Sequence, residues 1–253
     1  MKYYSELAQL GIFTIDDLVK ISGSKFNAEK AISSMMKNGE IRRIKRNLYT
    51  AVNASTKEDF SNKYIIASNI TKTSFVSYHS AFEFYGFYNQ VFYDVQVSSV
   101  KRFQNFVYGE YSYSCFETNC LTQVVEIQDC KVTTLERTIV DSINMLGKVM
   151  DVEEIIKCLD VIHNVDEEKI KEMLLIYDKD ILYRKVGYVL SFFKNQLGLN
   201  DSFFQFCKNH SNCKNIGFLS FDELNKLDFV NEWGLYGYKN LKNIIGKGGE
   251  IDV

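Results

Sequence analysis

The chain has 253 residues, 46% of them hydrophobic and 25% charged, which is the ordinary balance of a folded globular protein with a sizeable core. Its formal net charge is −2, so the whole protein is not a polycation, and any contact with nucleic acid has to come from a local basic surface. No run approaches the ~20 apolar residues of a membrane-spanning helix, and no secretory signal begins the chain. The six cysteines are scattered along the sequence. We therefore expect a cytoplasmic protein with reduced thiols and no membrane partner.

The first fifty residues predict two helices joined by a short turn. Thr14 can cap the first helix, which stops at Ser22-Gly23-Ser24. A second helix begins near Lys25 and ends at Asn38-Gly39. Its apolar residues recur at the spacing of one buried stripe, and they are Ala28, Ala31, Ile32, Met35 and Met36.

A basic hairpin follows these helices. Ile41 to Thr50 suits two short strands, and Arg46-Asn47 can form the turn between them because asparagine tolerates a positive φ. Helix, turn, helix and hairpin are the order of a winged helix-turn-helix, a module that most often holds double-stranded DNA. The alternative is a winged helix that serves as a protein-protein module with a merely solvated basic face.

The charge of this region favours the DNA-binding interpretation. Residues 24–46 contain seven lysines and arginines and two glutamates, a net of +5 on a chain whose total is −2. One face of the second helix is polar and would enter the major groove with the side chains of Lys25, Asn27, Lys30, Ser34 and Lys37. The hairpin, or wing, would contact phosphates or the minor groove through Arg42, Arg43, Lys45 and Arg46.

The remaining chain predicts strands first and helices later. Residues 53–56 form a linker, followed by helices over 58–69 and 79–85. Short strands are expected at 74–77, 91–98, 111–115, 124–127 and 131–133. Helices are then expected at 135–146, 152–163, 166–177, 181–197 and 201–209, with two short ones near 222–228 and 239–245. This order predicts an α+β fold. We expect a winged-helix domain over residues 1–55 and a larger α+β effector domain over residues 56–253.

Two side-chain groups resemble ligand sites but are poor matches. Cys207, His210 and Cys213 lie within seven residues, yet no fourth zinc ligand is near and the spacing is not a common one. Gly246-Lys247-Gly248-Gly249 lacks the glycine frame and the following Ser or Thr of a phosphate-binding loop. We therefore predict no metal and no cofactor.

Two further groups contain residue types that are found in catalytic sites. His79 lies near Ser77, Ser80 and Glu83, but residues on one short helix cannot easily converge as a nucleophile, base and orienting acid. Asp94 lies on the strand expected at 91–98, in which a metal-dependent nuclease would need a second carboxylate and a lysine. That strand offers Gln96 and Ser98 instead. We predict no catalytic residues and no enzyme activity.

Two charged clusters fall on predicted helices. Glu136-Arg137 and Asp141 are most simply surface ion pairs. Arg184 and Lys185, with neighbouring tyrosines, form a basic-aromatic cluster on a helix face that is more simply solvated but could make a secondary contact with DNA or a partner.

Five segments resemble the AbiEi family, the antitoxins of bacterial type IV toxin–antitoxin systems. The segment that is most specific to the family is Ser77-Tyr78-His79-Ser80-Ala81-Phe82-Glu83-Phe84-Tyr85-Gly86. The others are residues 11–14, 38–49, 134–141 and 184–188. Asn47 stands where the family usually has glycine, and Arg137 where it usually has lysine. The resemblance spans about residues 10–190 and does not extend to the last sixty residues.

The resemblance implies a protein with two tasks. The winged helix would bind operator DNA and repress the protein's own operon, while the C-terminal domain would counter a nucleotidyltransferase-type toxin without needing a stable complex with it. A ligand-responsive winged-helix transcription factor is the first alternative, and a DNA-targeted nuclease is the second.

Overall fold

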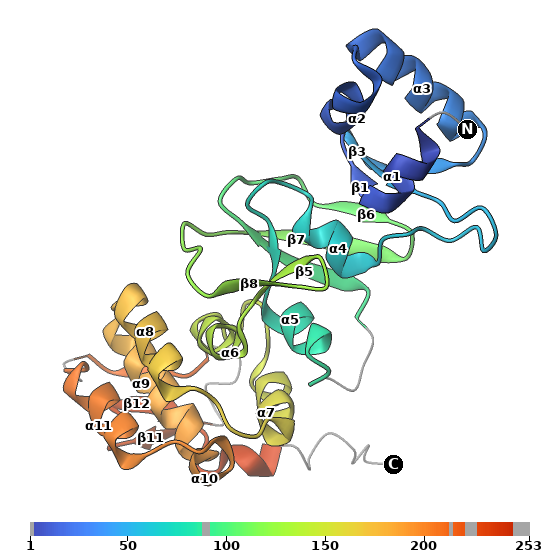
Figure 1. Ribbon diagram of the computed structural model, residues 1–253. Helices are drawn as coiled ribbons and strands as arrows, with labels where there is room; N and C mark the ends of the chain where they lie inside the picture. Colours follow the sequence, from blue (N-terminus) through green and yellow to red (C-terminus); the bar gives the residue numbers. More distant parts are fainter. Residues whose placement is uncertain (1–2, 88–91, 213–214, 221–226, 245–253) are drawn as a thin grey trace, which may run out of the picture. The chain divides into compact units, whose positions relative to one another are not determined.

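The computed structural model of the chain describes residues 3–87, 92–212, 215–220 and 227–244 (Figure 1). It divides into two compact units, between which the chain passes three times. Unit 1 comprises Met1–Val76 and Phe92–Val132, and unit 2 comprises Ser77–Val91 and Thr133–Val253. The boundary that the sequence predicts at residue 55 lies within unit 1.

Unit 1 begins with a winged helix-turn-helix, drawn in blue in Figure 1. Its sheet has the order β1-β3-β2 and both pairings are antiparallel. The elements are α1 (Tyr4–Leu10), β1 (Ile12–Phe13), α2 (Ile15–Ser22), α3 (Lys25–Lys37), β2 (Ile41–Lys45) and β3 (Leu48–Ala51). The two predicted helices and the hairpin are confirmed, whereas α1 and β1 were not predicted.

Local side-chain chemistry sets the bounds of α2 and α3. Thr14 and Asp17 form a capping box in which each side chain accepts a hydrogen bond from the other residue's backbone N–H. Gly23 ends α2 with φ 78°, a conformation that favours glycine. Ser24 then caps α3 by accepting from the Asn27 N–H. The turn between the two helices is therefore encoded within about four residues.

The core of the winged helix is built from the predicted stripe of α3. Ala28, Ile32 and Met35 are buried, Ala31 is partly buried, and Met36 is 41% exposed at the edge of the stripe. They pack against residues from every other element of the winged helix, namely Leu7, Phe13, Leu18, Ile41, Tyr49 and Ala51.

A mixed six-stranded sheet completes unit 1, with the order β6-β7-β5-β4-β9-β8. Its strands are β4 (Phe75–Val76), β5 (Asp94–Ser99), β6 (Phe106–Tyr108), β7 (Tyr111–Glu117), β8 (Val124–Ile127) and β9 (Cys130–Thr133). The pairs β5–β7 and β4–β9 are parallel, and the pairs β4–β5 and β6–β7 are antiparallel. The helix predicted over 58–69 is shorter, α4 (Lys63–Ser68), because Asn62 caps it while Asp59 forms a bridge with Val52.

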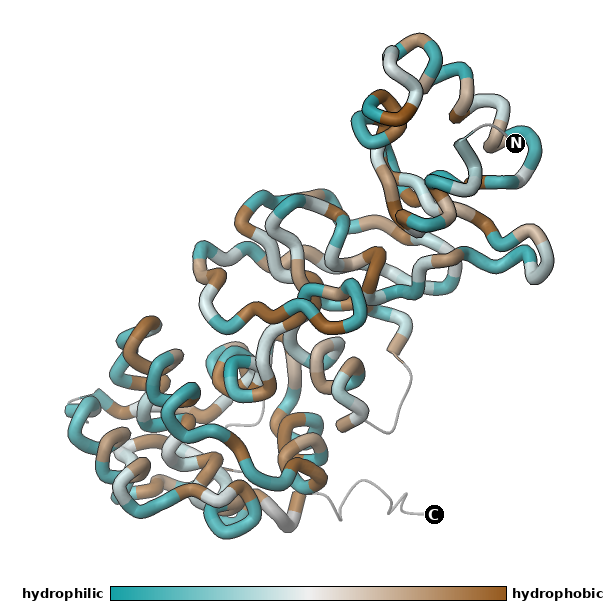
Figure 2. The backbone as a smooth tube through the Cα atoms, viewed as in Figure 1, coloured by the Kyte–Doolittle hydropathy of each residue, from teal (hydrophilic) through white to brown (hydrophobic). Residues whose placement is uncertain are grey.

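Unit 2 is helical with one small sheet. Its helices are α5 (Tyr78–Phe84), α6 (Leu135–Asn144), α7 (Val152–Val161), α8 (Glu167–Tyr177), α9 (Asp180–Ser191), α10 (Lys194–Leu197), α11 (Asp201–Asn209) and the 3-10 helix η2 (Leu241–Ile244). Hydrophilic and hydrophobic colours alternate along them in Figure 2, as in helices that are buried on one side. The helix predicted over 181–197 is two helices, α9 and α10, broken at Phe192 and Phe193.

The small sheet of unit 2 was not predicted. It has the order β10-β12-β11, with strands β10 (Gly217–Phe218), β11 (Asp228–Val230) and β12 (Leu235–Gly237). Most of the short helix expected at 222–228 lies outside the described residues. The sequence therefore predicts the α+β class correctly but not the strands at the end of the chain.

Charged residues of α6 lie inside unit 2 rather than on its surface. Arg137 is 1% exposed, and its guanidinium Nε donates to Asp141 at 3.1 Å. Asp141 also accepts from the Tyr177 hydroxyl, and Glu136 accepts from the Asp166 backbone N–H at 3.1 Å. The prediction of surface ion pairs is wrong here, because the spacing of a helical ion pair is the same for buried and exposed pairs.

Candidate nucleic-acid interface

The outer face of α3 carries the predicted groove-facing residues, and all of them are exposed. They are Lys25, Asn27, Lys30, Ser34 and Lys37. Lys25 lies 4.0 Å from the Glu29 carboxylate, a weak surface pair. Among the described residues, the side chains of Lys30 and Lys37 make no hydrogen bond or ion pair. Their ammonium groups are therefore free to bind an anionic ligand.

The tip of the wing carries further exposed cations. The register between β2 and β3 shifts between Arg43 and Lys45, so that Arg42 and Arg43 are both exposed while Ile44 is buried. Arg46 is exposed beside the turn. Asn47 adopts φ 60°, and its side-chain oxygen accepts from the Ile15 N–H at 3.0 Å. Asn47 therefore ties the wing to α2 by a side-chain contact that glycine could not make.

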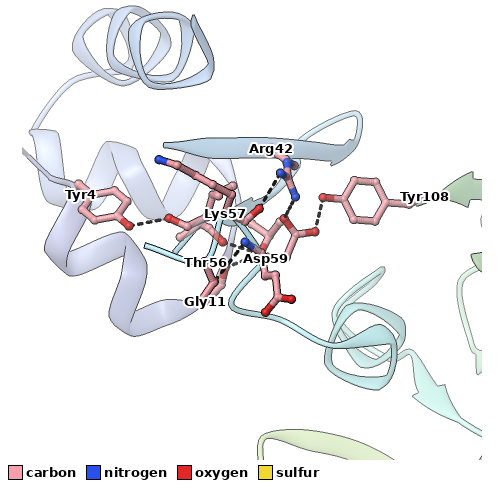
Figure 3. A network of polar contacts seen from close by, with 11 residues as sticks. Tyr4, Gly11, Arg42, Thr56, Lys57, Asp59 and Tyr108 are labelled. Carbon is pink, nitrogen blue, oxygen red and sulfur yellow. Dashed lines mark hydrogen bonds and ion pairs between the residues drawn. The ribbon is translucent and has the colours of Figure 1, made fainter. Parts of the chain in front are cut away.

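Arg42 is held by residues outside the winged helix (Figure 3). Its guanidinium forms an ion pair with Asp59 at 2.9 Å and donates to the Lys57 carbonyl oxygen at 2.8 Å. Asp59 accepts a second hydrogen bond, from the Tyr108 hydroxyl of β6, at 2.6 Å. Burial, and then this hydrogen bond, raise the pKa of Tyr108. Through Asp59 and Tyr108, Arg42 therefore connects the wing to the six-stranded sheet of unit 1.

Lys45 is the second wing cation that is engaged within unit 1. Its ammonium lies 5.1 Å from the centre of the Phe103 ring and 5.3 Å from that of Phe106. Burial lowers the pKa of Lys45, and the nearby Cys115 partly offsets that effect. The sequence predicts that all four wing cations contact DNA. In the structure Arg43 and Arg46 remain exposed, whereas Arg42 and Lys45 contact the strands that follow the wing.

The proposed secondary contact does not lie on the surface. Arg184 is 2% exposed; it pairs with Asp180 and donates to the carbonyl oxygens of Asn215 at 2.9 Å and Gly234 at 2.8 Å. These contacts attach α9 to the small sheet of unit 2. Lys185 is 9% exposed. The basic-aromatic cluster is therefore part of the folded interior of unit 2. The prediction of a DNA or partner contact at Arg184 is corrected, because the last strands of the chain pack over α9.

We expect replacement of Lys185 by methionine to stabilise the protein at neutral pH. Burial, and then the charge of Lys148, lower the pKa of Lys185 from 10.5 to about 8. Below that pH its ammonium is charged in both the folded and the unfolded state, so the full burial penalty is present. Between pH 8 and 10.5 the folded state loses its proton first, so the wild type regains stability relative to the variant. The Lys185→Met gain should be about 1–3 kcal/mol at pH 7 and should shrink above pH 8. Urea unfolding at several pH values measures this gain in the free energy of unfolding. A gain that does not change with pH would contradict a lowered pKa of Lys185.

The other chemical candidates do not form an open site. Ser77, His79 and Ser80 are buried. The Asp94 carboxylate accepts from the hydroxyls of Ser112 at 2.8 Å and Ser114 at 2.7 Å, which explains its place in the strand without a metal. Cys213 and residues 246–249 lie outside the described residues. In the part of the chain that is described, no group of three His, Cys, Asp or Glu side chains could hold a metal ion.

Comparison with solved structures shows a protein of similar fold. No protein-family model and no curated protein matches the chain. Its fold is similar to that in the crystal structure of the RV2827C protein from Mycobacterium tuberculosis, with a TM-score of 0.68 and 13% sequence identity. The similarity covers 97% of this chain and 94% of that one. The shared feature is the α+β fold. In the described part of the chain, no helix is both long enough and apolar enough to cross a bilayer.

Proposed function

We propose that the protein is a cytoplasmic antitoxin and transcriptional autorepressor that binds double-stranded operator DNA through its winged helix. The observation that carries the DNA-binding part is the set of exposed cations on α3 and at the tip of the wing. Lys30, Lys37, Arg43 and Arg46 are exposed on elements that winged helices use for the major groove and the flanking phosphates. Lys25 adds a fifth charge that Glu29 holds only weakly.

This distribution of charge suits DNA because it is local. The chain as a whole has a net charge of −2, so a general attraction to polyanions is not expected. Five cations on one helix and one hairpin are enough to fix a winged helix on the phosphate backbone, while Asn27 and Ser34 supply hydrogen-bonding groups for base edges.

The antitoxin part of the proposal is supported by the resemblance to the AbiEi family. Under this proposal the second task, countering a nucleotidyltransferase-type toxin, needs no catalysis by this protein and no stable complex. Co-expression of the toxin encoded next to this gene with full-length Lys30→Gln/Arg46→Gln protein tests both tasks at once. The variant should lose repression of the promoter but still rescue growth. A variant that represses normally yet fails to rescue would contradict this division of tasks.

The salt dependence of DNA binding tests the DNA-binding part directly. With three to five cations neutralising phosphates, the slope of log K against log[salt] should be roughly −3 to −5 for duplex DNA. Fluorescence anisotropy of the full-length protein on the duplex upstream of its own gene, titrated with salt, measures the slope. A slope near zero, or no binding, would remove DNA from the proposed function.

A further inference from the structure

Phe26 is the most exposed large hydrophobic side chain among the described residues, at 74%. It is the second residue of α3, beside Lys25 and Asn27. Within the described ranges its ring contacts no other aromatic ring, and its side chain makes no polar interaction. A phenylalanine ring in water leaves unused the roughly 1.5–3 kcal/mol that burial of such a side chain provides. Its side chain is therefore available to pack against an apolar group of a ligand.

The ring lies on the ridge of α3 that faces away from the core. At 3.6 residues per turn, Phe26 shares one face with Lys30, Ser33 and Lys37, on the side opposite Ala28. Ala28 is fully buried, whereas the four residues of the ridge are exposed. An aromatic ring and two free cations thus form one continuous surface.

The beginning of α3 is well fixed, which gives the ring a defined place. Ser24 caps the helix by accepting from the Asn27 N–H at 3.2 Å, one residue beyond Phe26. The first turn of a recognition helix is the part that reaches base edges in the major groove. The capped first turn fixes the backbone position from which Phe26 projects beside Lys30, and an apolar side chain at this position can contribute to discrimination between bases.

We propose that Phe26 is a specificity residue that packs against the C5-methyl group of thymine in the major groove. This rests on the proposed DNA-binding function. The thymine methyl is the apolar group that the major groove presents, and phenylalanine is among the side chains that contact it. The lysines of the same ridge contact phosphates regardless of sequence, so Phe26 adds a preference for thymine that charge cannot supply.

Removal of single methyl groups from the DNA tests this contact. The probe is the duplex that the full-length protein selects from a random-sequence library, with each thymine of the selected site replaced in turn by deoxyuridine. For the wild type, one or two of these replacements should weaken binding about 4-fold, the effect of losing one buried methyl group. The Phe26→Ala variant should bind the unmodified duplex about as weakly as the wild type binds the substituted duplexes. Replacement of the same thymines by deoxyuridine should not weaken its binding further.

The matched control is Leu10→Ala, which removes another exposed apolar side chain, 52% exposed, from α1. It should keep the full response to deoxyuridine. The proposal is overturned if Phe26→Ala keeps that response, or if no deoxyuridine weakens the wild type. It is also overturned if Phe26→Ala alters only the oligomeric state in sedimentation, because the ring is then a contact between copies. Absence of salt-dependent binding by the wild type would instead overturn the proposed function itself.

Discussion

Replacement of Lys30 and Arg46 together by glutamine is expected to weaken binding of the full-length protein to duplex DNA about 30-fold at about 0.15 M salt. Each phosphate contact contributes roughly 0.7 log units at this ionic strength through release of counterions. Both side chains are exposed, and neither makes an ion pair among the described residues, so their loss should leave the fold intact. The slope of log K against log[salt] should become less steep by about 2.

The matched control removes the same charge from the two engaged cations of the wing. Arg42→Gln/Lys45→Gln deletes the ion pair with Asp59 and the contacts with Phe103 and Phe106. Because these cations already have partners in unit 1, the salt slope should stay within about 0.5 of the wild type. The affinity of this variant for DNA should fall only to the extent that the wing departs from its orientation in the wild type. An equal loss of slope in both double variants would mean that the total charge of the wing, and not its arrangement, governs binding.

The winged helix could be predicted because its signals are local. The cap of α2 at Thr14, the glycine after it and the apolar stripe of α3 each lie within a few residues of the structure they determine. The turn of the hairpin depends likewise on one residue, Asn47, with its positive φ. The partners of Arg42 and Lys45 could not be predicted in this way, because Asp59, Tyr108 and the two phenylalanines come from later strands.

The helices of unit 2 show why burial of a charged residue is harder to predict than its secondary structure. In α6, Glu136, Arg137 and Asp141 have the spacing of a surface helix, yet all three are buried with polar partners. Arg184 in α9 is buried because carbonyl groups from residues far along the chain accept from it. The strands that follow these carbonyl groups, β10 and β12, have two or three residues each, too few for an alternating pattern to be recognised.

Gly187→Ala is expected to destabilise unit 2 by about 3 kcal/mol, because the site has no room for a methyl group. A Cβ at this position would lie 2.2 Å from Cη2 and 2.3 Å from Cζ3 of Trp233. Trp233 is 2% exposed and is the only tryptophan of the sequence, so its fluorescence reports on this contact during unfolding in urea. A cost below about 0.5 kcal/mol would mean that the ring shifts freely and that the contact is not specific.

A second substitution separates this clash from a general effect of alanine in α9. Trp233→Phe removes part of the ring that the new methyl group would meet, so the double variant should lose less stability than the sum of the two single variants, by at least about 1 kcal/mol. Circular dichroism measures unfolding where the tryptophan is absent. Such coupling would mean that packing alone accounts for the residues from Arg184 to Tyr188. Arg184 donates to the carbonyl groups of Asn215 and Gly234. Gly187 leaves room for the Trp233 indole, and the Tyr188 hydroxyl donates to the Tyr238 carbonyl oxygen. The resemblance to the AbiEi family at these positions would then reflect how the end of the chain is held on α9, whereas the proposed contact with DNA involves α3 and the wing.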